Sequence, residues 1–139
     1  MSLWILDTNH VRYLQDSHPN ILKRLAVTNP EDVAITDITA EEQIRGWLKF
    51  MDLKSARCIW AYKGFRDTLA YLEAVNILGF DENAYEIYLD LKKRLTNRVG
   101  TKDLQIAAIA LSVHGIVVTS NHKDFGQVTN LLIEDWTLE

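Results

Sequence analysis

Acidic residues at three separate places in the chain have the types expected of ligands for a hard divalent cation. Asp7 follows one apolar run and Asp103 precedes another. Between them, Glu41 and Glu42 lie near the start of a helical pattern, where neighbouring side chains point in different directions and only one faces a given site. Carboxylates that are brought together repel one another, and a divalent cation relieves that repulsion. Bound Mg²⁺ polarises a phosphate ester and lowers the pKa of an attacking water, so the acids predict metal-assisted hydrolysis of a phosphodiester.

Each acid also has an explanation that involves no chemistry. Asp7 is a preferred helix N-cap, and Asp103 lies where the helix dipole favours a carboxylate. Thr39 and Glu42 have the spacing of a capping box, in which the Glu side chain reaches back to the N-cap backbone. A metal site requires all of the acids to meet at one place, so the elements that carry them decide between the two interpretations.

Alternating apolar runs and helical patterns predict an α/β protein. Short buried strands are expected over residues 3–6, 33–36, 77–80, 116–119 and 131–134. Helical periodicity is expected over residues 20–27, 39–53, 55–76, 82–97 and 101–114. Strands that alternate with helices favour a three-layer sandwich, with a central parallel sheet of about four or five short strands flanked by helices.

This architecture predicts where a ligand binds, because open parallel sheets bind ligands outside the carboxyl ends of their strands. Directly after expected strands come Asp7, Asp37, Asn121 and Asp124. Thr8 and Asn9 add neutral oxygen ligands beside Asp7, in the combination that a hard cation accepts. The candidate carboxylates are therefore expected at one edge of the sheet.

Basic residues are concentrated in two segments, although the net charge is only −4. Six of them lie between residues 45 and 66, and five lie between residues 92 and 102, directly before Asp103. Such cations bind phosphates without reading sequence, whereas single Lys and Arg side chains on helices usually form a solvated face. For contacts with RNA phosphates the candidates are Arg45, Lys49, Arg98 and Lys102.

Composition excludes several other classes of protein. With 47% hydrophobic and 24% charged residues, the 139-residue chain has the balance of one folded domain, expected over residues 1–139. A single cysteine, Cys58, forms no internal disulfide, and the four histidines lack zinc-site spacing. No apolar run is long enough for a signal peptide or a membrane span, so a cytoplasmic protein is expected.

Four segments, taken in order, resemble the motifs of one family. They are Leu6-Asp7-Thr8-Asn9, Thr39-Ala40-Glu41-Glu42-Gln43-Ile44-Arg45-Gly46, Gly100-Thr101-Lys102-Asp103-Leu104-Gln105-Ile106-Ala107-Ala108, and Val118-Thr119-Ser120-Asn121 followed by Asp124-Phe125. On these segments the chain resembles the PIN-domain ribonucleases, in particular the VapC toxins of bacterial toxin-antitoxin pairs. The resemblance covers nearly the full length.

The resemblance assigns roles to individual residues. It implies Asp7, Glu42 and Asp103 as the three catalytic acids, and it selects Glu42 over Glu41 because the family's Glu lies four residues before a Gly, here Gly46. Asp7 and Asp103 are expected to bind Mg²⁺ or Mn²⁺. Further candidate ligands and supporting oxygen donors are Asn121, Asp124, Thr8, Asn9 and Thr119.

The resemblance also implies a homodimer, cleavage of structured RNA such as tRNA, and neutralisation by a small antitoxin whose tail covers the site. At the fourth metal-site position the family often has Asp, whereas this chain has Asn121, which puts a second metal in doubt. The alternative is therefore a catalytically weak PIN domain that binds RNA or a partner protein without turnover.

Overall fold

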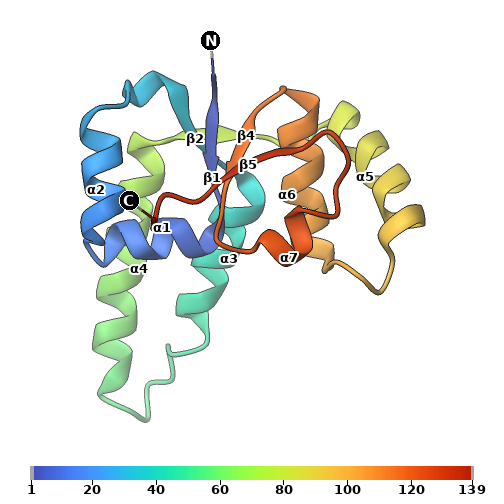
Figure 1. The fold of residues 1–139 in the computed structure, drawn as a ribbon. Coiled ribbons are helices and arrows are strands. Elements are labelled where there is room, and N and C mark those ends of the chain that lie inside the picture. Colours follow the sequence, from blue (N-terminus) through green and yellow to red (C-terminus); the bar gives the residue numbers. More distant parts are fainter. Residues whose placement is uncertain (1, 139) are drawn as a thin grey trace.

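The computed structural model describes residues 2–138, which form a parallel sheet flanked by helices (Figure 1). The strands are β1 (Trp4–Leu6), β2 (Val33–Thr36), β3 (Asn76–Leu78), β4 (Ile116–Val118) and β5 (Leu132–Glu134). The helices are α1 (Thr8–Gln15), α2 (Pro19–Ala26), α3 (Asp37–Leu48), α4 (Arg57–Ala74), α5 (Glu82–Leu95), α6 (Thr101–Ser112) and α7 (His122–Phe125), and a 3-10 turn covers Pro30–Asp32.

The sheet has five strands in the order β3-β2-β1-β4-β5, and every neighbouring pair is parallel. This confirms the expected α/β class and central parallel sheet. The chain leaves β1 toward β2 on one side and reaches β4 on the other, so the strand order reverses at β1. Ligands of open parallel sheets bind at such a reversal, outside the carboxyl ends of the strands.

Alternating side chains of the central strands fill two separate cores. Ile5 and Val117 pack with α5 and α6, whereas Leu6, Ile35 and Val118 pack with α1, α2 and α4. Figure 1 shows these two groups of helices on opposite sides of the sheet. A register slip of one residue would exchange the two faces, so burial on both sides fixes the strand ends and the residues that follow them.

The observed elements differ from the expected ones at specific places. Helices α1 and α7 were not expected, because their short sequences contain several polar residues that also suit loops and ligands. Helix α3 begins at Asp37 rather than at residue 39, since the Thr36 hydroxyl accepts a hydrogen bond from the backbone N–H of Thr39 at 3.1 Å and caps the helix. It ends at Leu48 rather than at residue 53.

Helices α3 and α4 pack along each other and extend away from the sheet (Figure 1). Gly64 of α4 lies against the Trp47 ring of α3, and the Trp47 Nε1–H donates to Thr68 Oγ1 at 2.8 Å. Within residues 2–138, none of the helices combines the length and the apolar character needed to cross a membrane.

Candidate active site at the carboxyl edge of the sheet

Asp7 lies at the end of β1 and is 5% exposed. Its backbone N–H donates to the carbonyl of Val118 in β4 at 3.0 Å, which places the residue at the reversal of the strand order. Its Oδ1 accepts a hydrogen bond from the backbone N–H of His10 at 2.8 Å and caps α1. The capping interpretation therefore holds for Asp7, but this cap uses only one oxygen of the carboxylate.

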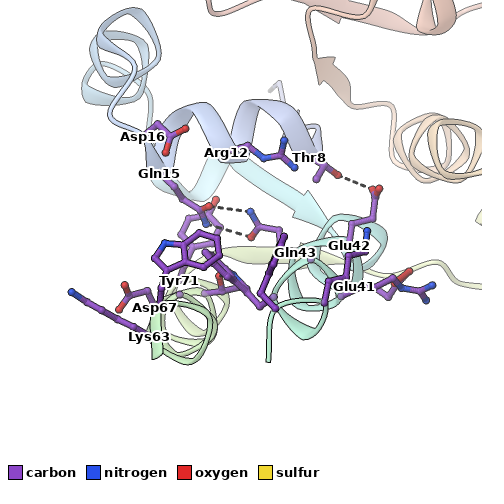
Figure 2. A pocket seen from close by; sticks show the side chains of 18 of the residues that line it. Thr8, Arg12, Gln15, Asp16, Glu41, Glu42, Gln43, Lys63, Asp67 and Tyr71 are labelled. Carbon is purple, nitrogen blue, oxygen red and sulfur yellow. Dashed lines mark hydrogen bonds and ion pairs between the residues drawn. The ribbon is translucent and has the colours of Figure 1, made fainter. Parts of the chain in front are cut away.

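Glu42 of α3 reaches across to the start of α1. The Thr8 hydroxyl donates to Glu42 Oε1 at 2.8 Å (Figure 2). It also lies 3.0 Å from the Thr39 hydroxyl. The expected capping box of Thr39 and Glu42 is wrong, because the N-cap of α3 is Thr36 and Glu42 lies further inside the helix. The Glu42 carboxylate is therefore directed to the segment that follows β1.

Glu41 points to a different group of residues. Its Oε2 accepts from Arg45 Nε at 2.7 Å, and its Oε1 pairs with Lys102 of α6. The hydrogen bond from Lys102, together with the positive charges of Lys102 and Arg45, holds the Glu41 pKa below its usual value. The two neighbouring acids are thus separated, with Glu42 beside Thr8 and Glu41 in an ion-pair group on α3 and α6.

Asp103 lies in the first turn of α6 and carries a strongly perturbed carboxyl. Burial, together with the negative charges of Asp124, Asp7 and Glu42, raises its pKa to about 6. The Asn121 amide opposes this, since its Nδ2–H₂ donates to Asp103 Oδ2 at 3.2 Å. Three acids from separate parts of the chain therefore lie near enough to Asp103 to influence its ionisation.

The carboxylates do not form a closed cage. Within residues 2–138, no three His, Cys, Asp or Glu side chains converge closely enough to enclose a metal ion. The donor set is nevertheless composed of oxygens, which suits Mg²⁺ or Mn²⁺ rather than a softer metal. Burial raises the pKa of Asp103, and the negative charges of Asp124, Asp7 and Glu42 contribute to the rise; a cation would relieve this repulsion.

Asn121 links two of these carboxylates. Its Nδ2 donates to Asp103 Oδ2 at 3.2 Å and to Asp124 Oδ2 at 3.1 Å, while its Oδ1 accepts from the Asp124 backbone N–H at 3.3 Å and caps α7. The Thr119 hydroxyl accepts from the Asn121 backbone N–H at 2.9 Å and fixes the loop after β4. In this arrangement Asn121 presents its amide nitrogen, rather than its oxygen, to the carboxylates.

A groove of about 1010 Å³ lies beside the acids, between α1, α3 and α4 (Figure 2). Thr8 and Glu42 line one part of it, and Gln15 of α1 and Gln43 of α3 exchange hydrogen bonds across it at 3.1 and 3.4 Å. Burial raises the pKa of Tyr71, which also lines the groove, to about 12. The basic residues that line it are Arg12, Arg45, Lys49, Lys63 and Lys102.

The four expected RNA contacts thus divide into two groups. Arg45, Lys49 and Lys102 line the groove, whereas Arg98 is exposed in the turn before α6 and is not among its lining residues. Asn9, expected as a supporting oxygen donor, is exposed on α1, while Thr8 beside it bonds to Glu42.

Sequence reasoning did not include His10 in the site. The side chain is completely buried, and its Nδ1 lies 3.3 Å from Asp7 Oδ1. Because no helix was expected over residues 8–15, the i,i+3 relation between Asp7 and His10 gave no signal. A helix that starts at Asp7 would have placed the two side chains together.

Several known proteins are similar to this chain in sequence and fold. Residues 4–131 match the PIN domain family. Ribonuclease VapC1 of Haemophilus influenzae is 29% identical over 97% of this chain and 98% of its own length. The tRNA(fMet)-specific endonuclease VapC of Salmonella typhimurium is 29% identical over 98% of this chain and 99% of its own length. The structure of VapBC-1 from nontypeable Haemophilus influenzae has a TM-score of 0.79 and 30% identity, and the match covers 97% of this chain and 98% of that one.

The chain therefore belongs to the PIN domain family. Its relatives include proteins named Ribonuclease VapC, and its structural neighbours include VapBC proteins, which confirms the resemblance drawn from the four sequence segments.

Proposed function

We propose that this protein is a metal-dependent endoribonuclease and the toxin of a toxin-antitoxin pair. The observation that carries the proposal is that Asp7 and Glu42 lie near enough to Asp103 for their negative charges, together with burial and the charge of Asp124, to raise its pKa to about 6. A capping role explains Asp7 but not Glu42. The PIN family membership and the relatives named Ribonuclease VapC support hydrolysis of RNA.

The acids have distinct roles in this proposal. Asp7 and Asp103 would hold Mg²⁺ or Mn²⁺, with Asp124 as a further ligand. Asn121, after a turn of its amide, would offer a carbonyl oxygen. A bound divalent cation would supply an activated water and stabilise charge on the scissile phosphate. Glu42, oriented by the Thr8 hydroxyl, would orient or deprotonate the attacking water.

Structured RNA such as tRNA is the proposed substrate. The groove is lined by five basic residues, of a kind that binds phosphates, and also by the acids Asp16, Glu41, Glu42 and Asp67. One relative is named a tRNA(fMet)-specific endonuclease. The test is cleavage of total cellular RNA by the purified protein with Mg²⁺, with Mn²⁺ and with EDTA. Discrete metal-dependent products that are lost in Asp103→Asn would support the proposal. Cleavage that EDTA leaves unchanged would contradict the metal.

The second candidate is a PIN domain that binds RNA or protein without turnover. The observation that favours it is Asn121, which occupies the position where PIN-domain ribonucleases often have a fourth acid. Its amide nitrogen donates to both Asp103 and Asp124. An Asn121→Asp variant separates the candidates. Cleavage that appears only in the variant would identify the parent as a binding module, whereas cleavage by both proteins would identify an enzyme.

We further propose a homodimer that a small antitoxin neutralises. The neighbouring VapBC structure supports an antitoxin partner, and an antitoxin Arg would pair with carboxylates such as Asp7 and Asp103. Light scattering of the purified protein, alone and after co-expression with a candidate antitoxin, would measure the assembly. A monomer that binds no candidate antitoxin would contradict both parts.

A further inference from the structure

His10 connects the first acid of the site to the C-terminal segment. Its imidazole is 0% exposed, and its Nε2 accepts a hydrogen bond from the Trp136 backbone N–H at 3.3 Å. Asp135 Oδ1 lies 3.4 Å from the same nitrogen, and the Tyr13 ring packs edge-on against the imidazole. The ring is therefore held by the protein on the side away from Asp7.

The environment of Nε2 determines the state of the other ring nitrogen. A neutral imidazole that accepts the Trp136 N–H at Nε2 carries its proton on Nδ1. An imidazolium balanced by Asp135 also carries a proton on Nδ1. In both forms, a donor N–H faces Asp7 Oδ1 across 3.3 Å.

This donor has no aligned acceptor among residues 2–138, although it is fully buried. An unpaired buried donor is unfavourable, and in unliganded sites functional hydrogen bonds are often poorly aligned. The contacts at Nε2 and with Tyr13 hold the imidazole, so the alignment of this pair depends on the orientation of the Asp7 carboxylate. The geometry thus couples the orientation of Asp7 to His10.

We propose that His10 is a positioning residue for Asp7. Its backbone N–H already donates to Oδ1, and its Nδ1–H, 3.3 Å from the same oxygen, would add a second hydrogen bond once the carboxylate is aligned, which would leave Oδ2 for the cation. Groups that orient a metal ligand in this way typically change metal affinity about 10- to 100-fold when they are removed. The inference rests on the proposed metal-dependent function.

Three substitutions separate positioning from packing. In His10→Asn the amide nitrogen takes the place of Nδ1, in His10→Gln the amide takes the place of Nε2, and His10→Phe keeps the ring without either nitrogen. Mn²⁺ binding to each metal-free protein is measured without RNA by electron paramagnetic resonance, and thermal unfolding is recorded in parallel. We expect Gln and Phe to weaken Mn²⁺ binding about 10- to 100-fold and Asn to retain most of it.

Equal losses in the Asn and Gln variants, or no loss in Phe, would overturn the proposal. A parent protein that binds no Mn²⁺ would overturn the proposed metal dependence and this inference together, whereas a binding parent with unaffected variants would overturn only the role of His10. If the variants fail to fold, ¹⁵N spectra of the parent decide. A proton on His10 Nδ1 whose resonance shifts on Mg²⁺ addition is expected, and an unprotonated or unresponsive Nδ1 would refute the role.

Discussion

At the scale of single residues, the folded protein disfavours ionisation of the Asp103 carboxyl. Its pKa is about 6 in the folded protein against 3.8 for a free carboxyl, because burial and the charges of Asp124, Asp7 and Glu42 disfavour ionisation. The folded state therefore binds this proton more tightly than the unfolded chain. The contribution of Asp103 to the free energy of unfolding should fall as pH rises from about 4 to about 6, and stay low above that range.

Urea unfolding in EDTA at several pH values tests this expectation. Solvent screening at the partly exposed Asp103 reduces the effect to about 1 kcal/mol at pH 7, and Asp103→Asn should recover it. Other carboxylates titrate in the same range, so the quantity of interest is the difference between the parent and this variant. If the difference in free energy of unfolding between the parent and Asp103→Asn does not change between pH 4 and pH 7, the pKa of Asp103 is not raised in the folded protein.

Residue types and order sufficed to predict Asp7, Asp103 and Asp124 as neighbours, because all three follow strands or begin a helix at the same edge. The partners of each side chain did not follow from the sequence. Glu41 and Glu42 differ only in the direction of their side chains. His10 lies beside Asp7 because residues 8–15 form a helix of eight residues, and the polar residues of this helix weaken its hydrophobic pattern in the sequence. Such contacts depend on packing between elements that are distant in the chain.

At the scale of elements, α3 and α4 shape the groove through one close contact. A Cβ on Gly64 would lie 2.3 Å from the Trp47 ring, which donates to Thr68 at 2.8 Å. We expect Gly64→Ala to displace the ring, break this hydrogen bond and lower the free energy of unfolding by about 1–3 kcal/mol.

Gly46→Ala is the matched control, because Gly46 also lies inside a helix but a Cβ there would meet no atom within 4 Å. It should leave stability unchanged or raise it by up to about 1 kcal/mol, as expected for Gly to Ala in a helix. Urea unfolding of both variants provides the comparison. Similar stabilities for the two would show that the contact between α3 and α4 does not require Gly64.

Apolar periodicity predicted the five strands to within about two residues, because buried parallel strands are short apolar runs between turn-forming residues. It was less accurate at helix ends. The start of α3 depends on a Thr36 hydroxyl that was assigned to the preceding strand, and α7 has only four residues. Local capping, rather than hydrophobic pattern, decides these boundaries.

At the scale of the whole molecule, the proposed function requires a chain of net charge −4 to bind a polyanion, and we propose that it does so in the groove. Arg45 and Lys102 pair with Glu41, while Lys49 lines the groove outside this ion-pair group and Arg98 lies outside the lining. We expect Lys49→Ala to weaken binding of structured RNA and to reduce the slope of log affinity against log salt by about 1.

Arg98→Ala serves as the comparison, because it removes the same charge away from the groove. Filter binding in EDTA at several salt concentrations measures both variants without cleavage. A larger loss in Arg98→Ala than in Lys49→Ala would place the RNA path on the α5–α6 side instead.

Both the proposed function and the role of His10 require a divalent cation at the carboxyl edge of the sheet. Anomalous diffraction from a crystal soaked in Mn²⁺ tests this requirement most directly. We expect an anomalous peak for an Mn²⁺ ion within bonding distance of oxygens of Asp7 and Asp103, and no peak there in crystals of Asp103→Asn. A fully soaked crystal without density between these carboxylates, or with Mn²⁺ bound only elsewhere, would contradict both proposals.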